Sequence, residues 1–199
     1  MSEIGPNAVL QLLPLIERDC GSTGAAAIRR RAGLRQVPDG HSMIAEEDAV
    51  GLHRALRREA PSMAARLAAE AGTRTADYLL ANRIPRPVQV VLRALPAGLA
   101  ARLLSRAIAR NAWTFAGSGR FRVVDPWTFE IDANPFVRGE RGPSRLCHWH
   151  AAVFTRLYAT LVHPASRCRE TRCAARDAGD VCRFEISRPG AAAASYDGA

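Results

Sequence analysis

The sequence predicts an α+β protein, with a helical first half followed by an antiparallel sheet that packs on helices. Residues 1–111 are rich in Ala, Leu and Arg and contain a single aromatic residue, Tyr78. Ten of the twelve aromatic residues lie between Trp113 and Phe184, where apolar and polar residues begin to alternate. Helices and strands that occupy separate parts of the chain are typical of α+β folds.

The first half contains several helical patterns. The clearest is Glu46–Glu59, where Val50, Leu52 and Leu56 recur at helical spacing, carboxylates occupy the first turn and arginines the last. This order of charges complements the helix dipole. Further helices are expected at Asn7–Asp19, Gly21–Arg31, residues 62–81 and Leu99–Arg110.

The second half changes to a period of two. Trp127, Phe129 and Ile131 alternate with polar residues, which predicts a half-buried strand. The remaining expected elements are a partner strand at Phe121–Val124, a strand at Trp113–Phe115 with a hairpin turn at Gly117–Gly119, a helix at Cys147–Val162 and a last strand at Cys182–Ser187.

These elements predict one domain over residues 1–188. Residues 1–111 would be mainly helical, and residues 112–188 would hold the sheet with one long helix. Residues 189–199 have the composition of a disordered tail.

The charged residues exclude some chemistry. There are 28 basic residues, all of them Arg, and 19 acidic residues, so the net charge is +9. A chain without Lys cannot use a Schiff-base lysine or a P-loop lysine. No motif for specific nucleic-acid binding is visible. Arg102, Arg106 and Arg110 form one helical stripe that is suited to water, anionic lipid or an acidic ligand.

The cysteines point to a reducing compartment. There are five, an odd number, and the first residues lack the pattern of a signal peptide. The most apolar segment, Val88–Ile108, is broken by three arginines and a proline, which argues against a membrane span. The expected location is the cytoplasm, with a peripheral contact to the photosynthetic membrane once the pathway below is considered.

Cysteines clustered in the last third of the chain suggest a metal site. Cys147 begins a helix, while Cys173 and Cys182 flank a predicted turn. Together they supply three of the four ligands that a tetrahedral zinc ion needs. Spacing alone leaves the fourth ligand open among Glu170, Cys168 and His150, and buried thiols without a metal explain the pattern equally well. Cys20 stands apart as a small buried hydrophobe.

Two histidines follow the first of these cysteines. His148 and His150 point about 200° apart on a helix, so they cannot both ligate one ion. Either is a candidate ligand-binding residue, because an imidazole can bind the magnesium of a tetrapyrrole axially.

The cysteine pattern resembles the 4-vinyl reductase domain family. The residues that carry the resemblance are Cys147, Glu170-x-x-Cys173 and the segment 179–184 with Cys182. In phenol-responsive sensors of this family, such a set holds zinc beside the ligand pocket. The resemblance therefore implies that Cys147, Glu170, Cys173 and Cys182 are the metal ligands. Strict strand alternation would separate Glu170 from Cys173, so a bulge must lie between them.

The resemblance extends over residues 5–189 and is strongest to the bacteriochlorophyll-biosynthesis branch, through Cys147-His148-Trp149-His150. It implies an antiparallel sheet packed on helices, a homodimer, structural zinc, and a magnesium-tetrapyrrole of the protochlorophyllide type as ligand. We expect a carrier or chaperone that presents this pigment to pathway enzymes. The alternatives are a reductase of the tetrapyrrole vinyl group, for which no cofactor motif is visible, and a ligand-dependent regulatory sensor.

Overall fold

The computed structural model describes residues 2–188, which form eight helices and two antiparallel sheets. The expected α+β class is confirmed. The expected tail at residues 189–199 lies outside the described residues. None of the helices between residues 2 and 188 combines the length and the apolar character needed to cross a bilayer.

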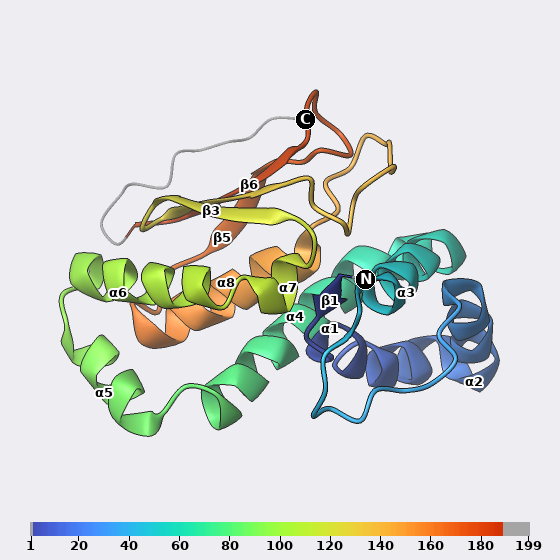
Figure 1. Ribbon diagram of the computed structural model, residues 1–199, viewed down its shortest axis with the longest axis horizontal. Coiled ribbons are helices and arrows are strands. Elements are labelled where there is room, and N and C mark those ends of the chain that lie inside the picture. The colour runs from blue at the N-terminus through green and yellow to red at the C-terminus, as the bar shows by residue number, and fades with distance from the viewer. Residues whose placement is uncertain (1, 189–199) are drawn as a thin grey trace.

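Helices make up most of the first 116 residues (Figure 1). They are α1 (Asn7–Leu10), α2 (Leu13–Ala32), α3 (Glu46–Glu59), α4 (Pro61–Asn82), α5 (Arg86–Ala94), α6 (Ala97–Arg110) and α7 (Trp113–Ala116). Two very short strands, β1 (Glu3–Ile4) and β2 (Ile44–Ala45), pair with each other beside them.

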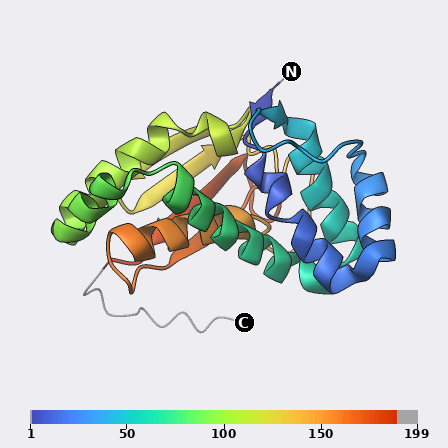
Figure 2. The ribbon, with the colours of Figure 1, turned by 90° about the horizontal axis from the view of Figure 1, so that it is seen from below.

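The main sheet has four antiparallel strands in the order β3-β4-β6-β5. Its members are β3 (Arg120–Asp125), β4 (Thr128–Asp132), β5 (Cys168–Arg172) and β6 (Val181–Ile186), and α8 (His148–Leu161) lies between β4 and β5 in the chain. Helices α6 and α8 lie against one face of this sheet (Figures 1 and 2). Helix α4 packs along α8 and joins the sheet to the α1–α3 end of the molecule.

Two expected elements differ from the structure. The segment Trp113–Phe115 is not a strand but part of the short helix α7, held by local hydrogen bonds such as Ala116 N–H to the Ala112 carbonyl at 2.8 Å. A three-residue alternation is too short to distinguish the two conformations. The two helices expected at residues 7–31 meet differently: α1 ends at Leu10, and α2 continues to Ala32 through a kink at Gly21, where φ is +67°.

The polar face of β4 is also covered. Phe129 and Ile131 point into the core as expected, but Thr128 and Glu130 are buried as well. The Glu130 carboxylate pairs with Arg122 and Arg183 from the neighbouring strands, and these side chains cover it.

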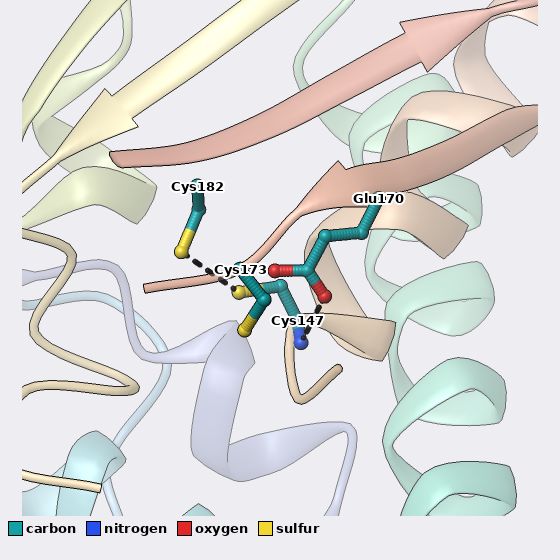
Figure 3. Close-up of side chains that lie close together, drawn as sticks. All are labelled: Cys147, Glu170, Cys173 and Cys182. Atoms are coloured by element: carbon teal, nitrogen blue, oxygen red, sulfur yellow. Dashed lines mark hydrogen bonds between the residues drawn. The ribbon is translucent and has the colours of Figure 1, made fainter. Parts of the chain in front are cut away.

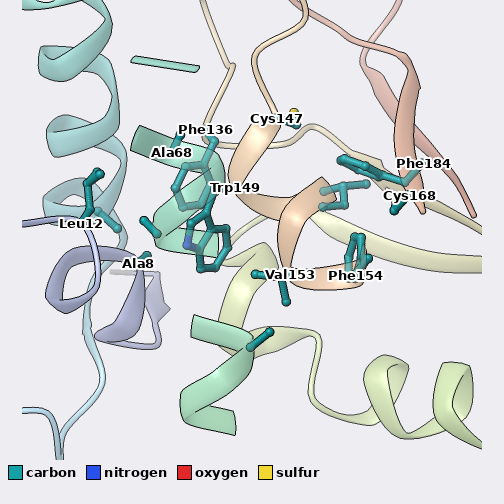
Figure 4. Packing of buried hydrophobic residues seen from close by; sticks show 14 of the residues in the cluster. Ala8, Leu12, Ala68, Phe136, Cys147, Trp149, Val153, Phe154, Cys168 and Phe184 are labelled. Carbon is teal, nitrogen blue, oxygen red and sulfur yellow. The ribbon is translucent and has the colours of Figure 1, made fainter. Parts of the chain in front are cut away.

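Aromatic side chains of α8 hold the two halves together (Figure 4). Phe154 packs edge-on against Phe129 and Phe184 of the sheet, with ring centroids 5.1 and 5.5 Å apart. On the other side, Trp149 stacks on Phe136 at 5.6 Å. The helix α8 is therefore buried on most of its surface, and its N-terminal residues are held rigidly where the candidate site begins.

Candidate functional site

Four acidic or thiol side chains converge where α8 begins and the β5–β6 hairpin ends (Figure 3). Cys147 immediately precedes α8, Glu170 lies on β5, Cys173 follows β5, and Cys182 lies on β6. One donor atom from each residue lies within 4.8 Å of the other three, and all four residues are buried. The structure thus brings together the four residues that the family resemblance selected.

A break in the strand register makes this convergence possible. Glu170 pairs with Phe184, whereas Arg172 pairs with Arg183, so an irregularity lies between Glu170 and Arg172. The strand then ends, and the Cys173 carbonyl accepts the N–H of Asp177 at 2.7 Å to start a turn. The expected irregularity between Glu170 and Cys173 is confirmed, and it lets both side chains reach one point.

Glu170 has one oxygen that the protein satisfies and one that it does not. The backbone N–H of Cys147 donates to Oε2 at 2.9 Å. Oε1 is buried and has no hydrogen-bond partner. Burial raises the pKa of this carboxyl to about 8. Burial likewise raises the pKa of the Cys147 thiol well above its usual range. An unpartnered buried carboxylate oxygen is costly unless a cation or a proton satisfies it.

The donor set fits a zinc ion. The sulfurs of Cys147 and Cys182 are 3.5 Å apart, too far for a disulfide bond of about 2.05 Å. Two thiolates on a tetrahedral zinc ion, each at about 2.3 Å, would be separated by about 3.8 Å. Three sulfurs and the free Oε1 of Glu170 would complete four-coordination and leave no open position.

The other proposed ligands lie elsewhere. Cys168 is at the opposite end of β5, where its backbone N–H donates to the Thr155 hydroxyl at 2.9 Å. His150 lies on α8 with its Nε2 3.2 Å from the Phe115 carbonyl oxygen. Cys20 is on α2 and is only partly buried. None of these three belongs to the cluster within residues 2–188.

One neighbour of the cluster carries no sequence signal. The amide nitrogen of Asn134 donates to the Cys147 sulfur at 3.3 Å, and its oxygen accepts the Phe136 N–H at 3.1 Å. The second bond fixes the amide orientation that the first one needs. Asn134 lies in the loop after β4, and only the three-dimensional fold brings it to Cys147.

The two histidines occupy different environments. His150 is fully buried among aromatic rings, and burial lowers its pKa to about 4. His148 is half-buried at the start of α8, and burial lowers its pKa from the usual value. Of the two, only His148 reaches a surface groove.

This groove, of about 570 Å³, runs along the α4 and α8 helices. Small residues line much of it, including Ala69 and Thr73 of α4 and Ala151, Ala152 and Ala159 of α8. Polar groups stand at its borders: His148, Thr155, Arg156 and Arg167. The groove was not predicted, since its walls come from helices that are about 80 residues apart in the chain.

Family comparison defines the class of protein first. Residues 127–188, which include all four cluster residues, match the family model of the 4-vinyl reductase domain. The resemblance to this domain family is thereby confirmed.

Comparison with whole chains is more specific. The chain is 51% identical over 185 residues to the bacteriochlorophyll synthase 23 kDa chain of Cereibacter sphaeroides, covering 92% of this chain and 89% of the relative. It is 42% identical to the protein of the same name from Rhodobacter capsulatus, covering 94% and 88%. The chain belongs to this family, that of the bacteriochlorophyll synthase 23 kDa chain.

Solved structures with the same overall fold are H-NOX proteins. An Fe(II) unliganded H-NOX protein from K. algicida superimposes with a TM-score of 0.60 at 12% identity, covering 92% of this chain and 96% of the other. A second, from a study of heme distortion in the H-NOX family, gives 0.56 at 8% identity, covering 94% and 95%. At these identities the likeness concerns the fold alone.

Proposed function

We propose that this protein binds a magnesium-tetrapyrrole intermediate of bacteriochlorophyll synthesis and carries it to pathway enzymes. The observation that carries the proposal is the α4–α8 groove with a half-buried imidazole at its border. The names of the family relatives connect it to this pathway. The pigment is the protein's cargo in this proposal and not a resident cofactor.

The groove has the size and lining that a flat pigment needs. Its volume of about 570 Å³ lies within the usual range of small-molecule sites. The alanines along α8 keep side chains from projecting into it, so a planar ring can approach the helix. Such a ring would lie lengthwise between α4 and α8.

Polar groups at the borders match the two polar features of such a pigment. Burial favours the neutral imidazole of His148, because its pKa is lowered, and a neutral nitrogen can donate to magnesium. Arg156 and Arg167 can pair with a propionate carboxylate. Arg156 is already held by Asp77 at 2.6 Å, which keeps its guanidinium near the groove.

In this proposal zinc has a structural role. Bound by Cys147, Glu170, Cys173 and Cys182, it would tie the start of α8 to the β5–β6 hairpin. His148 is the next residue after Cys147, so the ion would also fix the position of the proposed pigment ligand. A four-coordinate ion of this kind supplies no open position for catalysis.

The fold neighbours support the same class of ligand. One of them, with a TM-score of 0.56, was solved in a study of heme distortion, and heme is also a tetrapyrrole. A carrier requires contact with the enzymes that make and use the pigment, and we place these pathway enzymes as its partners in the cytoplasm, with the protein acting as a homodimer.

An absorption titration tests the proposal. Purified protein is titrated with divinyl protochlorophyllide in the presence of NADPH, and the pigment bands and the NADPH absorbance are followed together. We expect a saturable shift of the pigment bands with NADPH unchanged. Conversion to the monovinyl pigment with loss of NADPH would instead establish the reductase, and no shift would refute pigment binding.

A matched pair of variants tests the groove. His148→Ala should weaken binding by about tenfold or more, the loss expected for one ligand or hydrogen bond to a charged centre. His41→Ala changes an exposed histidine far from α8 and should leave binding unchanged. Equal affinities of the two variants would place the pigment outside the α4–α8 groove.

A further inference from the structure

Helices α5 and α6 form one end of the molecule, opposite α2 and α3 (Figures 1 and 2). They follow the long helix α4, and α5 is held to the rest of the protein by few contacts, among them Arg93 Nε to the Thr160 carbonyl at 3.2 Å. Neither helix contributes a residue to the metal cluster or to the α4–α8 groove.

Helix α5 has its apolar residues on the outside. Gln89 is buried, and its amide donates to the carbonyls of Leu80 at 2.6 Å and Ile84 at 2.8 Å. The outward side carries three valines, Val88, Val90 and Val91, with exposed fractions of 47%, 64% and 56%. A helix that faces water normally shows the reverse pattern. Gathered exposed valines indicate a surface that meets another apolar phase.

Helix α6 continues this pattern with arginines. Leu99 and Leu103 are exposed and lie one turn apart. Arg102, Arg106 and Arg110 lie on the same side and are exposed. Among the ion pairs formed within residues 2–188, none includes these three arginines. Their guanidinium groups are therefore available to an external anion.

Nearly all of the net charge of the protein lies in this region. Residues 78–124 contain eight arginines and no acidic residue. The other 20 arginines almost balance the 19 carboxylates, so this segment accounts for eight of the nine net positive charges. Such a concentration creates a local positive potential that attracts a polyanionic surface.

We propose that the outward side of α5 and α6 docks on an anionic membrane surface. Valines and leucines would insert among the lipid headgroups, while arginines pair with lipid phosphates. With lengths of about 14 and 21 Å, the two helices are shorter than the bilayer core of about 30 Å, so they would lie on the membrane. We name this set the α5–α6 face: Val88, Val90, Val91, Leu99, Leu103, Arg102, Arg106 and Arg110.

The combination of charge and exposed aliphatic residues favours a lipid surface over a protein partner. Protein interfaces typically present aromatic anchors in a polar rim, whereas the α5–α6 face offers only aliphatic residues and arginines. Interfacial helices have this composition: aliphatic residues on one side and unpaired basic residues beside them. Docking on a membrane does not depend on pigment binding and can be tested on the full protein without pigment.

Vesicle flotation tests the proposal. The probes are vesicles of phosphatidylcholine alone and vesicles with 30% phosphatidylglycerol, at low and at physiological salt. We expect the protein to float with the anionic vesicles only, and less at higher salt. Each arginine near an anionic surface contributes about fivefold, so R102Q/R106Q/R110Q should weaken binding on the order of 100-fold.

Two controls separate the α5–α6 face from other effects. R30Q/R35Q/R58Q removes three exposed arginines from the opposite end and gives the same net charge, and it should retain at least a third of the wild-type binding. V90S/V91S should weaken binding about tenfold, because these side chains lose their apolar contact with the bilayer. V37S/V124S changes two other exposed valines and should have no effect.

Three results would overturn the proposal. The first is a wild-type protein that stays at the bottom of the gradient with anionic vesicles. The second is an equal loss of binding in the two triple-arginine variants, which would show attraction by net charge alone. The third is a wild-type dimer in sedimentation that V90S/V91S converts to a monomer, which would assign the α5–α6 face to contact between copies of the chain.

Discussion

The close approach of α4 and α8 predicts a large effect for a single added methyl group. Gly72 of α4 lies against α8, and a Cβ at this position would be 2.3 Å from the Trp149 carbonyl oxygen and 2.9 Å from the Ala152 Cβ. Nonbonded heavy atoms prefer about 3.5 Å or more, so the helices must separate by about 1 Å. The atom in the way belongs to the backbone and cannot turn aside.

Gly72→Ala should therefore be at the upper end of the overpacking range, lowering the free energy of unfolding by about 3 kcal/mol. For a protein of this size, that corresponds to a decrease in Tm of about 10 °C. The matched control is Gly98→Ala in α6, where an added Cβ meets nothing within 4 Å. Because alanine favours the helix over glycine, this variant should gain about 0.5–1 kcal/mol.

Urea unfolding and thermal melting, both followed by circular dichroism at 222 nm, measure the two variants side by side. The changes in the free energy of unfolding should have opposite signs for the two glycines. If Gly72→Ala unfolds within about 0.5 kcal/mol of the wild type, α4 and α8 are not in close contact at Gly72, and the α4–α8 groove loses its structural basis.

Two further predictions concern the metal and the pH. Cys173→Ser and Cys182→Ser should each weaken zinc binding by more than about 100-fold and lower Tm, since even residues behind a metal ligand are worth 10–100-fold; Cys20→Ser should keep its zinc in elemental analysis, and loss of metal from that variant would mean that the ligands are wrongly assigned. Burial lowers the pKa of His53 to about 3 and that of His150 to about 4. Both rings thus stay neutral in the folded protein while the unfolded chain takes up protons below pH 6.5, so the free energy of unfolding should be fully retained above about pH 6.5 and fall by up to about 2.7 kcal/mol per unit as the pH decreases toward 4. Urea midpoints at pH 7, 6 and 5 check this, and equal midpoints would contradict the burial of both neutral rings.

Local signals in the sequence were sufficient for the longer elements. The expected bounds of α3, Glu46–Glu59, agree with the structure, because the carboxylates at its start and the arginines at its end mark both termini. Strands β4 and β6 were expected from strict alternation. The two-residue strands β1 and β2 carry no such pattern, since their pairing depends on contacts between distant segments.

The candidate site was only partly predictable. Spacing identified the three cysteines but left Cys168 and His150 open as ligands beside Glu170, and the family resemblance chose Glu170. The register break that places Glu170 beside Cys173 depends on pairing with β6, which periodicity along β5 does not reveal. The groove escaped sequence analysis for a similar reason, because the alanines of α8 that line it look like ordinary helix formers.

The strand order of the main sheet has a consequence for the newly made chain. Strand β6 lies between β4 and β5, yet it is the last of the described strands to leave the ribosome. The edge of β4 must therefore wait while residues 133–180 are synthesised, which takes roughly 2 to 10 s at cellular elongation rates. During that time β4 presents Phe129 and Ile131 beside unpaired backbone groups, a template for pairing between nascent chains. Slower translation of residues 133–180 should thus raise the yield of aggregated protein, whereas slower translation of the helical first half should not.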